Sequence, residues 1–214
     1  MTPAELVAWR RATRAVLLAQ RQGVSAEERR RAVARIAARL DALCAQRRPA
    51  VVGLYWPIKL EFSLLRWGGA LAQRHGTVLC LPVVVTAKEP LEYWHWKPGA
   101  EMTTGVWNIP VPAERRVVIP DLVLAPLVGF DRAGYRLGYG GGYFDRTLAS
   151  LTPRPFAIGV GHAFGALETI FPQPFDIPMD AIVTEASDDQ TAPAGDTTGV
   201  PPPRAGLGRE ADQG

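Results

Sequence analysis

The chain has 214 residues, of which 47% are apolar, and a formal net charge of +3 at pH 7. This length and apolar content suffice for one hydrophobic core and exclude a coiled coil or a small disulfide-stapled scaffold. The chain has only two cysteines, Cys44 and Cys80, and no stretch approaches the ~20 apolar residues of a membrane span. We therefore expect a cytoplasmic protein with core cysteines and no membrane partner, either a monomer or a weak homo-oligomer.

The positive charge is concentrated at the N-terminus. Residues 1–48 hold eleven arginines and four acidic residues, whereas residues 188–214 hold two arginines and five acidic residues. The latter segment also has four prolines, five glycines and no aromatic residue, so it cannot bury enough surface to offset the entropy of ordering. We predict a single catalytic domain over 1–187 and a disordered Pro/Gly-rich tail over 188–214.

Two helices are predicted first, over 4–21 and 26–47. The second opens with Ser25-Ala-Glu-Glu28, the pattern of a capping box. Most of its arginines lie away from its apolar stripe, which is typical of a solvated basic face. In the first helix, Arg10, Arg14 and Arg21 lie within about 40° of one another among leucines. A guanidinium at the edge of a packed surface needs an anion or a carboxylate, and the sequence leaves both alternatives open for this trio.

Short β-branched runs follow, separated by turns and by helical stretches at 61–75 and from 143 onward. The runs cover 51–56, 77–85, 91–96, 122–130, 156–161 and 181–184. Continuous apolar strands that alternate with helices predict an α/β fold, a three-layer Rossmann-like sandwich with a mostly parallel mixed sheet. The run 91–96 alternates in character, as an antiparallel edge strand does.

A glycine-rich loop precedes the helix that begins at Tyr143. Its four glycines, 138 and 140–142, leave backbone N–H groups free of side chains at a helix N-terminus, an arrangement that favours phosphate. Neither G-x-G-x-x-G nor G-x-x-x-x-G-K-[ST] matches, and a glycine run is often only a tight turn. Arg136 before the loop suits phosphate charge, and Asp145 after it suits either Mg²⁺ or the ordinary first turn of a helix.

Several motifs together resemble the 5-formyltetrahydrofolate cyclo-ligase family, also called methenyltetrahydrofolate synthetase. The glycine segment RLGYGGGYFDRTLA, preceded by LAPLVGFD, is similar to the family signature. Arg10-x-x-x-Arg14, YWPIKLE and FDIPMDAIVTE resemble its first helix, its substrate loop and its closing segment. The resemblance covers roughly residues 5–186. It implies an enzyme that uses ATP and Mg²⁺ to convert 5-formyltetrahydrofolate to 5,10-methenyltetrahydrofolate, releasing ADP and phosphate.

The resemblance also implies a role for each matched position. Trp56 and Glu61 would face the reduced folate, and Tyr143 would lie between the two substrates. Asp145 and Asp180 would hold the metal, and Arg136, Tyr143 and Asp145 would act in catalysis. The ATP phosphates would be bound by residues of the first helix and of the glycine segment: Arg10, Arg14, Arg136, Leu137, Gly138, Tyr139, Gly140, Gly141, Gly142, Tyr143 and Phe144.

Two departures from the family pattern keep other functions open. Arg10 stands where the family often has lysine, and Val111 stands where a carboxylate is expected. Val111 motivates an alternative, a paralogue that keeps the ATP site but acts on another substrate. A third hypothesis, nucleic-acid binding through the basic N-terminal helices, lacks any recognised nucleic-acid motif and ranks last, so we expect no nucleic-acid partner.

Overall fold

The computed structural model describes residues 1–186, so the predicted tail lies outside the described residues. Six strands form the central sheet in the order β11-β9-β6-β1-β2-β3. Five run parallel to their neighbours and β3 runs antiparallel at the edge, which confirms the predicted mixed sheet. The strands are β1 (Val51–Gly53), β2 (Val78–Val83), β3 (Glu92–Trp96), β6 (Leu122–Pro126), β9 (Phe156–Val160) and β11 (Ala181–Val183).

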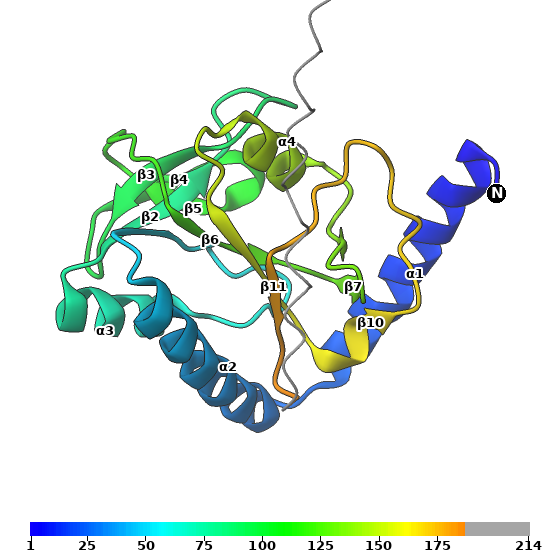
Figure 1. Ribbon diagram of the computed structural model, residues 1–214, viewed down its shortest axis with the longest axis horizontal. Helices are drawn as coiled ribbons and strands as arrows, with labels where there is room; N and C mark the ends of the chain where they lie inside the picture. The colour runs from blue at the N-terminus through cyan, green and yellow to red at the C-terminus, as the bar shows by residue number, and fades with distance from the viewer. Residues whose placement is uncertain (187–214) are drawn as a thin grey trace, which may run out of the picture.

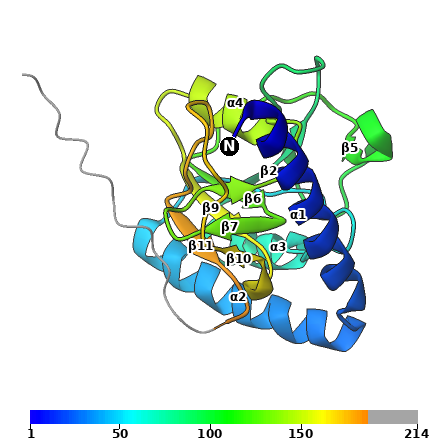
Figure 2. The ribbon, with the colours of Figure 1, turned by 90° about the vertical axis from the view of Figure 1, so that its right-hand side faces the viewer.

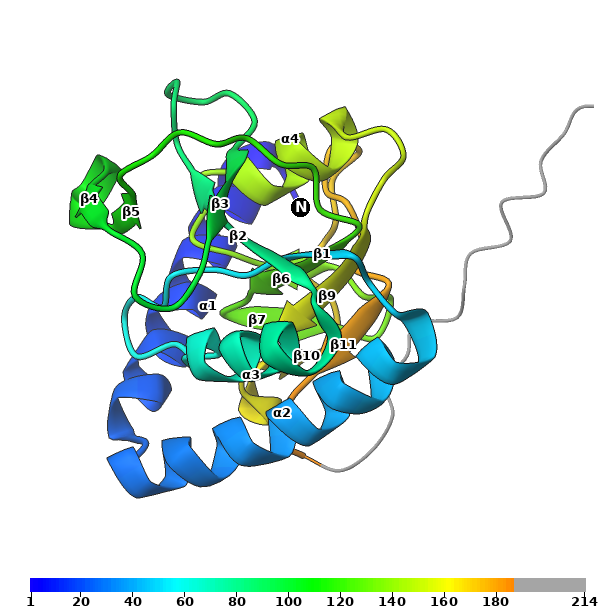
Figure 3. The ribbon, with the colours of Figure 1, turned by 90° about the vertical axis from the view of Figure 1, so that its left-hand side faces the viewer.

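Alternate side chains of these strands build a core on each face of the sheet. Leu122, Leu124 and Ile158 pack in the larger core with residues of α2 (Ala26–Arg47) and α3 (Leu65–His75). Ala125 and Ala157 point the other way, into a core closed by α4 (Tyr143–Ser150). Figures 1 and 3 show α2 and α3 on one side of the sheet and α4 on the other. The period-two pattern of a strand covered on both sides thus produces the three predicted layers.

Helix α1 (Pro3–Gly23) lies beside this sandwich rather than within it (Figure 2). It packs on a small sheet, ordered β10-β7-β8, made of β7 (Gly129–Asp131), β8 (Arg136–Leu137) and β10 (Ala166–Leu167). Leu17 lies so close to Gly129 that a Cβ at that glycine would be 2.9 Å from its methyl group. Only Leu17 and Arg21 of α1 are buried. The helix contacts the glycine loop through arginines rather than through core residues.

A two-stranded arm extends from the sandwich and is absent from the sequence prediction. It consists of β4 (Met102–Thr104), a 3₁₀ turn (Val106–Asn108) and β5 (Pro110–Pro112), and Figure 3 shows it on the side of the molecule that holds α1. Val111 is 7% exposed and packs against Gly105 within the arm. The valine noted as a departure from the family therefore has a packing role.

Three predicted elements differ markedly in extent. The strand expected over 51–56 ends at Gly53. The helix expected over 61–75 begins at Leu65, because Lys59 and Leu60 adopt positive φ angles in a turn that ends with the Glu61 amide on the Ile58 carbonyl. The strand expected over 122–130 divides at Pro126. The Val128 amide donates to the Leu137 carbonyl, so the chain passes there from the central sheet to the small one.

Among residues 1–186, no helix combines the length and apolarity that crossing a bilayer requires.

Candidate functional site

The glycine loop joins β8 to α4 and presents an uncapped helix N-terminus. Gly140 and Gly142 have φ angles of 95° and 64°, which a residue with a Cβ adopts only with strain. Gly142 is the N-cap and supplies no side-chain hydrogen bond to the first turn of α4. The first amides of the helix therefore remain available to an anion, and the helix dipole favours its negative charge.

Three guanidinium groups from different elements surround this loop. Arg14 Nε donates to the Gly138 carbonyl at 2.6 Å, and Arg146 Nη2 donates to the Gly141 carbonyl at 2.6 Å. A Cβ at Gly138 would lie 2.5 Å from Arg136 Nη1, and one at Gly142 would lie 2.8 Å from Arg146 Nη1. The glycines thus let the two guanidinium groups approach the loop backbone closely, and a side chain at either position would displace one of them.

The electrostatics of these three arginines favour an added anion. Within residues 1–186, neither Arg14 nor Arg146 forms a salt bridge. Burial lowers the pKa of Arg14, and the nearby charge of Arg10 lowers it further. Burial also lowers the pKa of Arg136, although Asp145 partly offsets that effect. Phosphate oxygens would relieve this repulsion and desolvation, because charge-assisted bonds to guanidinium are strong.

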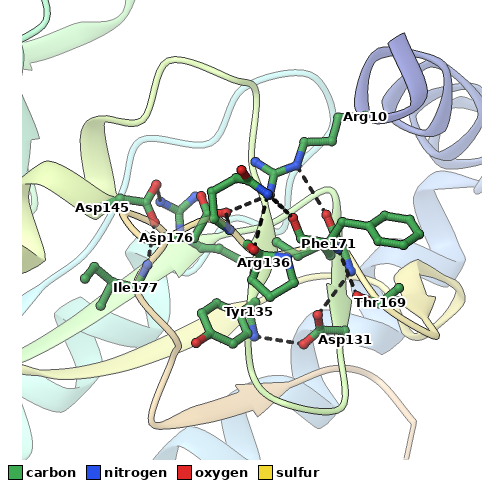
Figure 4. Close-up of polar contacts among 12 residues, drawn as sticks. Arg10, Asp131, Tyr135, Arg136, Asp145, Thr169, Phe171, Asp176 and Ile177 are labelled. Carbon is green, nitrogen blue, oxygen red and sulfur yellow. Dashed lines mark hydrogen bonds and ion pairs between the residues drawn. The ribbon is translucent and has the colours of Figure 1, made fainter. Parts of the chain in front are cut away.

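Asp145 is held in place by two partners (Figure 4). Its Oδ2 accepts from Arg136 Nη2 at 2.8 Å, and its Oδ1 accepts from the Ile177 amide at 3.2 Å. Arg136 and Asp145 are 6% and 15% exposed, so this is a largely buried ion pair. The carboxylate in the first turn of α4 therefore orients an arginine of the loop, whatever else it binds.

Asp180 lies elsewhere. Its carboxylate pairs with Arg154, beyond the last turn of α4, and accepts from the Ala157 amide at the start of β9. Asp145 occupies the first turn of α4, whereas Asp180 pairs with an arginine that follows the end of this helix. No group of three or more carboxylate, histidine or cysteine side chains gathers as a metal site within residues 1–186. Mg²⁺, which keeps most of its ligands as water and phosphate, fits this donor set only with Asp145 as a single carboxylate.

Arg10 is anchored to the segment before β11 (Figure 4). It pairs with Asp176 at 2.6 Å and also donates to the carbonyls of Ile170, at 3.2 Å, and Phe171, at 2.9 Å. The charge expected to meet phosphate is therefore already balanced by a carboxylate. In this structure Arg14 and Arg21, rather than Arg10, are the first-helix arginines that touch the glycine loop.

Glu61 joins the loop through Tyr139. Burial raises the pKa of Glu61, while the Ile58 amide, Tyr139, Arg21 and Lys59 offset part of that rise. Its Oε2 accepts from the Ile58 amide, and its buried Oε1 has no hydrogen-bond partner among the described residues. Glu61 also borders a hollow of about 380 Å³. A buried carboxylate with a free oxygen beside a hollow suits an N–H donor on a ligand.

Three aromatic residues near the site, Tyr143, Trp107 and Trp56, differ in their burial and contacts. Tyr143 begins α4, and its hydroxyl accepts from the Lys88 amide at 3.2 Å. Trp107, at the tip of the arm, is 64% exposed and meets the Tyr143 ring edge-on at 5.4 Å. Trp56 is half-buried and packs against the larger core. The arm thus reaches the glycine loop through Trp107, a residue to which the sequence prediction assigned no role.

Two further residues of the site were missed from the sequence. Arg146 follows the loop by one helical turn, and helical side chains lean toward the N-terminus, a signal that could have identified it. Asp176 offered no such signal, because only the fold brings it to Arg10. Both are charged residues that control how the arginines around the loop are used.

The fold and the site define an α/β protein in which three arginines surround a glycine loop at a helix N-terminus. The model of the 5-formyltetrahydrofolate cyclo-ligase family matches residues 7–185. The chain therefore belongs to the 5-formyltetrahydrofolate cyclo-ligase family.

Relatives and solved structures agree with this assignment. The chain is 34% identical over 100 residues to 5-formyltetrahydrofolate cyclo-ligase of Escherichia coli K12, covering 44% of this chain and 55% of that protein. It is 29% identical over 146 residues to that of Haemophilus influenzae, covering 64% and 76%. A matched segment of 65 residues spans 39% of the Mycoplasma pneumoniae cyclo-ligase, at 40% identity and over 30% of this chain. The matches thus span about half or less of the Escherichia coli and Mycoplasma pneumoniae proteins.

The solved structures match over nearly the whole chain. The Aquifex aeolicus 5,10-methenyltetrahydrofolate synthetase superimposes with a TM-score of 0.73 at 29% identity, covering 94% of this chain and 96% of that one. A Mycoplasma pneumoniae 5,10-methenyltetrahydrofolate synthetase has the same fold, with a TM-score of 0.69 at 24% identity, covering 83% and 99%.

Proposed function

We propose that this protein converts 5-formyltetrahydrofolate to 5,10-methenyltetrahydrofolate at the expense of ATP, with Mg²⁺, and releases ADP and phosphate. The observation that carries the proposal is the convergence of Arg14, Arg136 and Arg146 on a glycine loop at an uncapped helix N-terminus. The names of the relatives supply the folate substrate. A loop of this kind binds phosphate groups, and the family reaction supplies a triphosphate.

The chemistry needs positioning and charge stabilisation rather than a protein nucleophile. The formyl oxygen on N5 attacks the γ-phosphorus of ATP, and the bond to ADP breaks. N10 then attacks the activated formyl carbon, the C–O bond breaks, phosphate leaves and N10 loses its proton. Bound Mg²⁺ would neutralise charge on the phosphate oxygens. The loop amides and the three arginines would hold the triphosphate and stabilise the transferred group.

The remaining residues would orient the two substrates. Asp145 holds Arg136 beside the loop and would contribute a carboxylate oxygen to a metal site. Glu61 would accept an N–H of the reduced folate at its unpartnered oxygen. Tyr143, between Trp107 and the loop, would line the junction where the formyl group meets the γ-phosphate.

The test is a spectroscopic assay with protein, Mg²⁺, ATP and 5-formyltetrahydrofolate. We expect the absorbance of methenyltetrahydrofolate to grow only when ATP is present. If no absorbance develops although ATP binds, the proposal fails and the paralogue alternative gains support. Val111, which motivates that alternative, packs inside the arm.

Nucleic-acid binding gains no support from the basic helices. Several of their arginines are engaged within the fold. Arg39 donates to the Thr184 carbonyl, Arg47 lies over the Phe156 ring, and Arg31 pairs with Glu27.

A further inference from the structure

A buried polar cluster lies between α1, the glycine loop and Glu61. Arg21 is only 2% exposed, and it donates from Nη1 to the Tyr139 hydroxyl at 2.9 Å and from Nη2 to the Leu127 carbonyl at 2.7 Å. It forms no salt bridge within residues 1–186, and its Nε has no partner there. A buried guanidinium without a paired carboxylate is costly, so simple stabilisation does not explain its presence.

Tyr139 connects this arginine to the opposite side of the site. Its hydroxyl accepts from Arg21 and faces Glu61, whose pKa it lowers against the larger effect of burial. A phenol that accepts one hydrogen bond still has its own proton to donate to a carboxylate. Lys59 lies over the Tyr139 ring, 4.9 Å from its centre. The hydroxyl and one ring face of Tyr139 thus contact residues outside the loop.

Tyr139 also lies between Gly138 and Gly140 in the backbone that surrounds the phosphate site. A ligand that fixes the conformation of this loop therefore fixes the Tyr139 hydroxyl. The hydroxyl in turn faces the Glu61 carboxylate, which has one buried oxygen without a partner among the described residues. The Tyr139 side chain therefore lies between the two ligand-facing ends, the glycine loop and Glu61.

We infer that Arg21 and Tyr139 are positioning residues that couple the glycine loop to Glu61, so that nucleotide on the loop strengthens binding of the reduced folate at Glu61. By thermodynamic linkage the folate strengthens nucleotide binding by the same factor. The inference rests on the proposed function for the identity of the two ligands. Neither the Arg21 guanidinium nor the Tyr139 hydroxyl is required to touch the reacting atoms.

The first test uses nucleotide alone. The wild type, Glu61→Gln, Tyr139→Phe and the double variant are titrated with a non-hydrolysable ATP analogue and Mg²⁺ by calorimetry. We expect each single change to weaken analogue binding about fivefold and the double change to weaken it no further, because both break one connection. If the two effects multiply to within about twofold, the coupling is overturned.

The second test measures the affinity for 5-formyltetrahydrofolate with and without the analogue. We expect the analogue to raise the affinity at least about fivefold in the wild type, within the usual range of coupling between sites. The ratio should fall toward one in Tyr139→Phe and Arg21→Met, and Arg21→Lys should retain part of it. If Arg21→Met does not fold, Tyr139→Phe alone still decides the result.

Matched controls separate coupling from structure. Tyr135→Phe removes a hydroxyl that forms no hydrogen bond within the described part of the chain, and Arg11→Met removes an exposed arginine of α1; both should keep the wild-type ratio. A purely structural role would lower both affinities and leave the ratio unchanged, which would overturn the inference. If folate turnover is absent, the proposed function fails while the nucleotide cycle still decides the coupling. If no nucleotide binds, both fail.

Discussion

Arg136 and Asp145 pair across the glycine loop, with Nη2 and Oδ2 2.8 Å apart. Arg136 begins β8, just before the loop, and Asp145 lies in the first turn of α4, so the pair holds the two ends of the loop together. Since both side chains are largely buried, the ion pair keeps its geometry, and a buried partner left alone is costly. The two ends of the loop are therefore held together before any anion binds.

Asp145→Asn should impair both turnover and stability. The amide still accepts a hydrogen bond, but the buried Arg136 loses its compensating charge. We expect the free energy of unfolding to fall by roughly 2 to 4 kcal/mol, somewhat below the full loss of a buried partner. Urea unfolding and the absorbance assay measure the two effects. A variant with wild-type stability and turnover would show that the pair is dispensable.

Asp180→Asn is the matched comparison for Asp145. Asp180 and its partner Arg154 are 27% and 39% exposed, so their pair contributes about 1 kcal/mol or less. We expect turnover and its Mg²⁺ dependence to stay close to wild type, because the Asp180 carboxylate is already paired with Arg154 and bonded to the Ala157 amide. A marked rise in the Mg²⁺ concentration needed for turnover would return Asp180 to the metal site.

Gly142→Ala should weaken nucleotide binding beyond its cost in stability. Alanine at a φ of 64° costs about 1 kcal/mol, and its Cβ would displace the Arg146 guanidinium, which lies 2.8 Å from that position. Gly76 has a similar φ of 70° at the end of α3, with no atom within 4 Å of an added Cβ. Gly76→Ala should lose the same stability in urea unfolding and keep wild-type nucleotide affinity. Equal affinities in the two variants would contradict a role for Arg146 at the loop.

Arg14→Lys should reduce nucleotide affinity about tenfold or more. Lysine keeps the charge but loses the guanidinium geometry that bonds the Gly138 carbonyl at 2.6 Å, and a hydrogen bond from a charged group is worth about 1.5 to 3 kcal/mol. Arg11→Lys, on the exposed part of the same helix, serves as the control. Calorimetric titration with the ATP analogue compares them. The prediction fails if both variants bind alike.

Glu61→Gln should change how stability depends on pH. Burial raises the pKa of Glu61 above its ordinary value of 4.5, so in the pH range between these values the folded protein holds a proton that the unfolded chain has released. Unfolding is therefore favoured as the pH rises through this range. The wild type should lose stability relative to Glu61→Gln from pH 4.5 upward until the raised pKa is passed. Urea unfolding at several pH values measures the difference. A pH-independent difference would show that the Glu61 pKa is not raised.

Local patterns determined much of the architecture. The capping box at Ser25 and Glu28 places the start of α2, and the alternating run at 91–96 forms the antiparallel edge. Continuous apolar strands produced the parallel sheet. The arm over 102–112 escaped prediction because its strands are three residues long and contain Pro110 and Pro112, which disfavour a strand assignment.

Some features of the site, like those of the fold, could be predicted from local sequence, and others could not. The sequence alone indicated that this segment suits an anion. The signal lies within a few positions: four glycines, Arg136 and the helix that follows. Only the tertiary structure decided which charges are already balanced: Asp176 pairs with Arg10 across 166 residues, Asp180 pairs with Arg154, and Arg14 stays without a salt bridge within residues 1–186. Charge pairing depends on distance in space and on burial, which the order of residues along the chain does not specify.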